Sequence, residues 1–277
     1  MLITARLWKL AVGKIRHSDI DALMQLEGID EPFELSRMIL RGLVDEKKLN
    51  KKHSAFRHYI RKQKLRKLLS SPMMLSAIVC SYAEEIELKG SKCDIYILLL
   101  ESLFKKGNSE MCAFEQPPFP CFTGTQYIQP NMVHLNRLAE LAFHLLFVNT
   151  KENSIVFSIA DLKKFIIDES KDFALKSGIL SLKRNASTMR SVSSFMFIHK
   201  SMQEFLAAFH IARNTFLIDG IISVYLDRHE DEYLELSYVF IFMCGLDTSG
   251  ATELSNMIDE RNALNRRSRN NWYLNDH

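Results

Sequence analysis

The spacing of apolar residues constrains this 277-residue chain most, because it is helical along almost the whole sequence. Residues 132–148 show it best: their apolar side chains recur three and four positions apart and would share one helix face. The same pattern covers 18–48, 47–67, 73–83, 93–105 and 214–264. The polar tail at 265–277 lacks it. We therefore expect a mainly α fold.

One β-hairpin is expected among these helices. The apolar runs 179–182 and 194–198 flank a polar stretch from 183 to 193, and Phe195 and Phe197 alternate with other residues as in a strand. Helices are predicted before the hairpin at 132–148, 158–166 and 170–177, the last ending at Gly178. Three helices followed by a hairpin is the plan of a winged-helix module.

A further helix is expected after the hairpin. Ser201 and Glu204 have the spacing of a capping box, which would start it. Its predicted buried face consists of Phe205, Ala208, Phe209 and Ala212.

The clearest predicted linker is residues 106–131, which hold four of the six prolines and little periodic apolar content. It would separate a first helical domain (13–105) from the winged-helix domain (132–213). Residues 214–277 would be the start of a second helical domain. Residues 2–5 are predicted to form a strand, so 1–12 would be the remnant edge of an α/β core.

The stretch 47–67 is strongly basic, with ten Lys and Arg residues and no acid. Its apolar spacing still predicts an amphipathic helix. A solvated face, or one set against an acidic neighbouring module, is favoured over a nucleic-acid platform, because the rest of the chain is net negative. Ser18 and Ser36 are candidate helix starts, and Pro72 is predicted to open a helix.

Cysteine usage indicates a reducing compartment. The five cysteines are odd in number and none has CxxC spacing. Cys112 and Cys121 could pair under oxidation, although thiols packed as small hydrophobes are the favoured interpretation. The apolar runs near 216–226 and 238–246 are too short to span a bilayer, and the N-terminus lacks a signal-peptide pattern. We expect a cytoplasmic protein that does not contact a membrane.

The sequence contains no catalytic motif. None of its ten glycines begins a GxxxxGK[ST] loop, so no phosphate-binding loop is expected in this chain and no enzymatic activity either. The apolar run from Val239 to Asp247 superficially resembles a strand ending in a magnesium-binding aspartate, but its surroundings favour a buried helix. His199, between a predicted strand and helix, could either bind an anion or simply fix the corner by hydrogen bonding.

The segment from Phe195 to Phe209, FMFIHKSMQEFLAAF, resembles the winged-helix signature of NACHT-type signalling NTPases, the group that includes the NOD-like receptors. Shorter segments resemble other parts of that family in the same order. They are Leu2–Trp8, Leu26–Ile29, Leu68–Leu75 and Phe242–Leu246. The first departs from the family pattern, because Leu7 stands where proline is usual.

This resemblance implies three nucleotide contacts in an intact receptor. Arg6 would sense the terminal phosphate, Pro72 would pack on the adenine ring, and His199 would contact the β-phosphate of ADP. It also implies an upstream NACHT core with the phosphate loop, downstream sensor repeats, and a homo-oligomer on activation. ADP or ATP would bind in that context and not tightly to this chain alone. The alternatives are a winged-helix nucleic-acid-binding protein and a non-catalytic helical scaffold.

Overall fold

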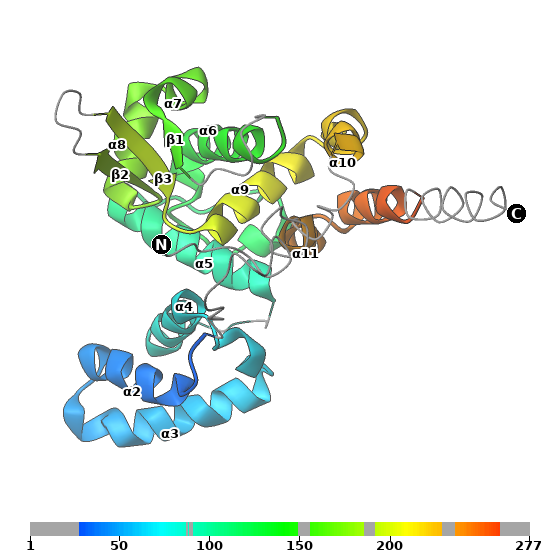
Figure 1. Ribbon diagram of the computed structural model, residues 1–277. Helices are drawn as coiled ribbons and strands as arrows, with labels where there is room; N and C mark the ends of the chain where they lie inside the picture. The colour runs from blue at the N-terminus through cyan, green and yellow to red at the C-terminus, as the bar shows by residue number, and fades with distance from the viewer. Residues whose placement is uncertain are drawn as a thin grey trace, which may run out of the picture.

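The computed structural model describes residues 28–86, 88, 91–148, 156–185, 192–228 and 236–260. The predicted strand at 2–5, Arg6 and Ser18 lie outside these ranges. The predicted mainly α fold is confirmed: helices dominate, and the strands form one small antiparallel sheet (Figure 1).

The longer helices are α2 (Pro32–Leu43), α3 (Glu46–Lys62), α4 (Pro72–Ala83), α5 (Lys92–Gly107), α6 (Met132–Phe143), α7 (Ile159–Phe165), α8 (Asp168–Ser177), α9 (Lys200–Arg213), α10 (Ser223–Arg228) and α11 (Ser237–Leu246). Residues 248–260 are also helical. Short 3₁₀ turns are η2 (Arg66–Leu68), η3 (Pro120–Phe122) and η4 (Gln129–Asn131), and π-helical turns are η5 (His144–Val148) and η6 (Ile218–Ile222). The strands are β1 (Val156–Ser158), β2 (Leu180–Asn185) and β3 (Val192–Phe197).

Helices α2, α3 and α4 form a lobe at one end of the molecule (Figure 1), and α2 packs against both others. Helix α3 buries one side only, through Leu49, Phe56 and Ile60. Pro72 opens α4, as predicted. The prediction that Ser36 starts a helix is wrong, because α2 begins at Pro32 and the Ser36 hydroxyl donates to the Phe33 carbonyl within the helix (2.8 Å).

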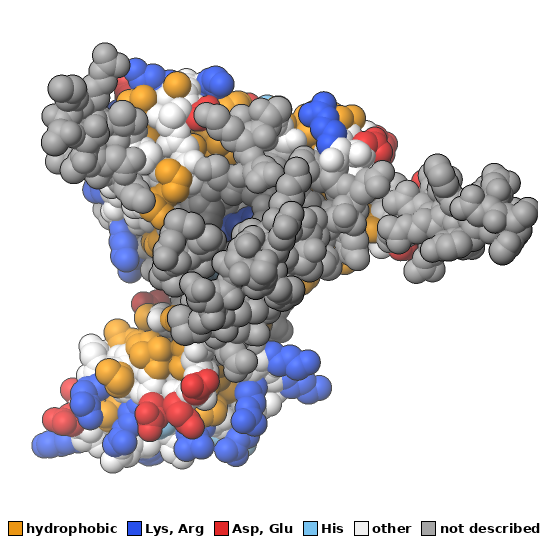
Figure 2. Space-filling model, in the orientation of Figure 1, with side chains coloured by type: hydrophobic (Ala, Val, Ile, Leu, Met, Phe, Trp, Pro, Cys, Tyr) orange, Lys and Arg blue, Asp and Glu red, His pale blue; other side chains and the backbone are white. Residues whose placement is uncertain are grey.

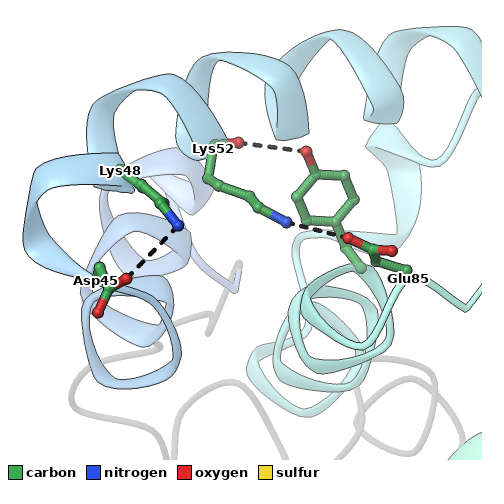
Figure 3. Close-up of polar contacts among 5 residues, drawn as sticks. Asp45, Lys48, Lys52 and Glu85 are labelled. Carbon is green, nitrogen blue, oxygen red and sulfur yellow. Dashed lines mark hydrogen bonds and ion pairs between the residues drawn. The ribbon is translucent and has the colours of Figure 1, made fainter.

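The solvent side of α3 is basic, as its sequence indicated. Figure 3 shows two of its lysines in ion pairs, Lys48 with Asp45 (3.8 Å) and Lys52 with Glu85 (3.5 Å). Both acids are largely exposed, so water screens these pairs. Lys and Arg side chains spread along the outer edge of the lobe with Asp and Glu among them (Figure 2). Such a mixture of positive and negative side chains is typical of a solvent-exposed face.

The predicted winged-helix plan is present in the second part of the molecule. Helices α6, α7 and α8 precede the hairpin of β2 and β3, and the sheet order is β1-β3-β2, antiparallel throughout. Strand β1 was not predicted, because three residues are too few to show an alternating pattern. Its Phe157 pairs with Phe195 of the central strand.

The helix ends of this module follow local sequence rules, with one exception. Ser158 and Asp161 form a capping box at α7, and Gly178 ends α8 in the left-handed region (φ 82°). The predicted capping box at Ser201 is wrong. Helix α9 begins at Lys200, so Ser201 lies inside it and His199 is the N-cap residue.

Helix α9 is the central element of the larger part of the molecule. It packs against α6, α11, α5 and β3, and eleven of its 14 residues are buried. The predicted buried face is confirmed, since Phe205, Ala208, Phe209 and Ala212 are all buried. The burial extends further, to Gln203 and Glu204 on the expected polar side. The segment that begins at Val239 likewise forms a helix, α11, as favoured above, and buries one face of it through Val239, Phe242, Met243 and Leu246.

The segment 106–131 is irregular, as its composition predicted, but it does not behave as a spacer. Its Phe122 and Ile128 are fully buried. The carboxylate of Glu101 on α5 accepts hydrogen bonds from the backbone amides of Gln126 (2.5 Å), Tyr127 (2.9 Å) and Ile128 (3.0 Å). Helix α5 itself packs against α4 on one side and α8 and α11 on the other, so packing is continuous across the predicted linker.

The five cysteines are all reduced thiols in the described part of the chain. Cys93 packs as a small buried hydrophobe, whereas Cys80, Cys112 and Cys244 are exposed. Cys121 lies beside Cys93, and their shared hydrogen bond together with burial raises the pKa of the Cys93 thiol. Among the described helices, none combines the length and apolar content that a membrane crossing requires.

Candidate functional site

The candidate site is the corner where β3 leads into α9. Phe195 and Phe197 anchor the strand in the core, and the Ile198 amide donates to the Ile179 carbonyl (2.9 Å). His199 follows with an extended backbone (φ −156°, ψ 148°) and an exposed side chain. The alternation of the strand and the start of the helix therefore place one imidazole at the surface, immediately before the buried helix.

The hydrogen bonds of His199 define the state of its ring. The backbone amide of Ser201 donates to Nδ1 of His199 (3.2 Å), the position at which a capping side chain accepts from the first turn. An amide N–H can only donate, so Nδ1 is the unprotonated nitrogen. The neutral ring then carries its proton on Nε2, on the far side of the imidazole.

Ser201 also connects His199 to a buried tyrosine. Its Oγ lies 2.5 Å from Nδ1 of His199, and the Tyr96 hydroxyl hydrogen-bonds to the same Oγ. Because Nδ1 accepts, Ser201 donates to it and accepts from Tyr96. The three residues form a relay from the core to the surface.

The Tyr96 ring is packed between aromatic side chains of two other helices. Its ring stacks on Phe205 of α9 (5.8 Å between centroids) and meets the edge of Phe242 of α11 (4.8 Å). Burial raises the pKa of Tyr96 to about 12. The phenol therefore stays protonated at physiological pH and can donate to Ser201.

Gln203 is an unusual residue for the interior of α9. It is fully buried, and neither its Nε2 nor its Oε1 forms a hydrogen bond within the described part of the chain. A buried amide without partners costs roughly 1–3 kcal/mol.

Pro72 lies in another part of the molecule, exposed in the first turn of α4. Just before it, the Ser70 carbonyl accepts from the Ile29 amide (3.0 Å), and Gly28 approaches so closely that a Cβ there would lie 2.5 Å from the Ser70 oxygen. The structure thus brings together Leu26–Ile29 and Leu68–Leu75, two of the segments whose sequence resembles the NACHT family, through their contacts at Gly28, Ile29 and Ser70. Helix α5 contacts both α4 and α9, but the described contacts do not join Pro72 to His199, and Arg6 lies outside the described residues.

A small pocket lies beside α9. It is lined by Leu146, Phe147, Lys200, Glu204, Tyr225, Leu236 and Val239. Its cavity volume of about 10 Å³ is far below the roughly 300–1,000 Å³ typical of ligand pockets. No group of three or more His, Cys, Asp or Glu residues within the described ranges could hold a metal ion.

Sequence reasoning identified His199 but missed the residues that hold it. Tyr96 lies 105 positions from Ser201, and nothing in the sequence signals that they meet. Ser201 was predicted to start a helix with a capping box. Only the structure, in which α9 begins at Lys200, shows that Ser201 lies inside the helix and donates to Nδ1 of His199. The scan against protein-family models and the search of curated proteins found no match to this chain.

Proposed function

We propose that this chain is the regulatory helical and winged-helix region of a NACHT-type, nucleotide-switched signalling protein. The observation that carries the proposal is the geometry of His199, whose sequence context resembles the family signature. Its Nδ1 caps α9, and its proton lies on Nε2 at an exposed corner. A histidine in this state can hold the corner and donate to a phosphate oxygen at the same time.

In this proposal ADP joins the winged helix to a nucleotide-binding core upstream of this chain. His199 donates to the β-phosphate, Pro72 packs on the adenine, and Arg6 senses the terminal phosphate once ATP replaces ADP. The exchange weakens the contact at His199 and frees the helical region to rotate and form homo-oligomers. This is a two-state switch biased by a ligand. The setting is cytoplasmic, and the chain has no catalytic turnover of its own.

The first alternative, a winged-helix nucleic-acid reader, fits the surface poorly. The third helix of the module, α8, would enter the groove, but its exposed residues include Asp168, Glu169 and Asp172, which would repel phosphates. The face bearing Phe173 is also covered, because that ring packs on Phe104 of α5 (5.0 Å). Helix α9 cannot serve as the recognition helix instead, because eleven of its 14 residues are buried.

The proposal is tested by titrating the chain, labelled with ¹⁵N-histidine, with ADP and following the ring signals by NMR. We expect weak binding, with dissociation constants on the order of 1 mM, that shifts the His199 signals. The His199→Leu variant should lose this binding while remaining folded, with a somewhat lower melting temperature because α9 loses its capping side chain. His58, exposed on the basic side of α3, is the internal control for general anion binding.

Three outcomes would contradict the proposal. If ADP shifts His58 as strongly as His199, the interaction is only that of a polyanion with the basic lobe. If duplex DNA binds the chain far more tightly than ADP, with an affinity that falls steeply with salt, the nucleic-acid alternative is favoured. Absence of binding by both, with His199 unshifted, would favour the helical scaffold.

A further inference from the structure

We infer that Tyr96 and Ser201 are positioning residues that lock His199 in a single neutral tautomer, with the proton on Nε2. The relay runs from the Tyr96 hydroxyl to Ser201 Oγ and from Ser201 to Nδ1 of His199. Its use toward a phosphate rests on the proposed function, whereas the tautomer is a property of this chain alone.

The inner end of the relay is rigid. The Tyr96 ring is 4% exposed and is wedged between Phe205 and Phe242, which also contact each other (5.3 Å). Tyr96 belongs to α5, Ser201 to α9 and Phe242 to α11. The relay therefore exists only when these three helices are packed together.

The outer end of the relay determines which nitrogen of His199 can donate. In water a neutral imidazole exchanges its proton between the two nitrogens. Here the Ser201 amide points at Nδ1 from 3.2 Å, and the hydroxyl of the same residue lies 2.5 Å away. A proton on Nδ1 would face the amide hydrogen, so that tautomer is disfavoured. His199 then presents an N–H donor without needing to be protonated, which suits contact with an anion at neutral pH.

Substitutions at two residues, Ser201 and Tyr96, separate the parts of the relay. Ser201→Ala removes the hydroxyl and keeps the amide donor, and Ser201→Thr restores a hydroxyl. Tyr96→Phe removes only the phenol oxygen from a ring whose packing is retained. Tyr82→Phe is the matched control, because the Tyr82 hydroxyl donates to the Lys52 carbonyl in the α2–α4 lobe (3.4 Å).

The experiment measures the ¹⁵N shifts of the His199 ring in the full chain above neutral pH, assigned by the loss of signals in His199→Gln. We expect a pyridine-type Nδ1 and a pyrrole-type Nε2 in the unsubstituted chain and in Ser201→Thr and Tyr82→Phe. Ser201→Ala, which keeps the amide donor but loses the hydroxyl, should shift the balance part of the way toward the other tautomer, and Tyr96→Phe should shift it by less. A protonated Nδ1 in the unsubstituted chain, or an unchanged tautomer in both Ser201→Ala and Tyr96→Phe, would overturn the inference.

ADP titration of the same variants keeps this inference distinct from the proposed function. If both hold, Ser201→Ala should weaken ADP binding by up to about twofold, because only the fraction of rings with the proton on Nε2 can donate to the phosphate. A locked tautomer in a chain that does not bind ADP would support the positioning role and refute the proposed function. If Ser201→Ala fails to fold, Tyr96→Phe against Tyr82→Phe still decides the question.

Discussion

Helices α3 and α9 differ most clearly in how they are buried. Three of the 17 residues of α3 are buried, and its other sides face solvent or ion pairs. In α9, eleven of 14 residues are buried, among them a glutamine and a glutamate. A helix buried on one side can be recognised from its own spacing, whereas one buried all round owes its environment to several neighbours. The candidate site lies at the start of α9, where those neighbours meet.

The largest effect that would test this contrast comes from removing one phenylalanine in each region. Phe205→Ala in α9 should lower the free energy of unfolding by about 3–5 kcal/mol, because it leaves a cavity between Tyr96 and Phe242. Phe56→Ala removes a fully buried ring from the lobe. We expect it to speed hydrogen exchange in α2–α4 more than in α9, as measured by mass spectrometry. Equal acceleration in α9 would show that the two regions open as one unit.

The next comparison concerns two carboxylates, Glu101 and Glu85. Glu101→Gln should cost about 1.5–3 kcal/mol, because the charged carboxylate accepts three backbone amides that fix the 106–131 segment. Glu85→Gln loses only an exposed ion pair with Lys52 and should cost under about 1 kcal/mol. Urea denaturation of both variants measures the difference. The Glu101 variant should also be cut faster by protease between 108 and 128, and equal resistance would show that this segment needs no such anchor.

Two helical glycines should respond to alanine in opposite directions. Gly245 of α11 lies so close to α5 that a Cβ would be 2.4 Å from the Cys93 Cβ, so Gly245→Ala should destabilise by about 1–3 kcal/mol. Gly42 of α2 has open space around it, so Gly42→Ala should stabilise by up to about 1 kcal/mol through its better helix propensity. Melting temperatures of the pair test this. A neutral Gly245→Ala would mean that α11 and α5 can move apart at little cost.

The pH dependence of stability should come mainly from the winged-helix part. Burial lowers the pKa of His134, His144 and His210 there, and of His53 in the lobe. These histidines resist protonation in the folded chain. As the pH falls through about 6.5, the unfolded chain therefore binds more protons than the folded chain, and the free energy of unfolding decreases. The melting temperature should therefore fall between pH 8 and pH 5.5. His144→Phe, which keeps an aromatic ring against Phe165, should flatten the slope, and an unchanged profile would contradict the assignment.

What the sequence alone determined follows from local rules. The helical periods, the proline at the start of α4, the glycine after α8, the hairpin and the position of His199 are all readable from neighbouring residues. The two predicted helix starts that were wrong, Ser36 and Ser201, share a cause: each fits a local pattern for a helix start but lies inside a helix that begins earlier. Ser201 satisfies a capping pattern, yet His199 caps the helix, because β3 ends at Phe197 and α9 begins at Lys200, so Ser201 already lies in the first turn.

Only the tertiary structure decided which distant residues share the site and how the regions connect. Nothing near Ser201 predicts Tyr96, and nothing in the proline-rich composition of 106–131 predicts that Glu101 fixes it. Both depend on the packing of α5 against α9 and α11, which brings together side chains far apart in the chain. A backbone amide or a hydroxyl forms a hydrogen bond with whichever partner the fold places within reach, so these contacts leave no periodic trace in the sequence.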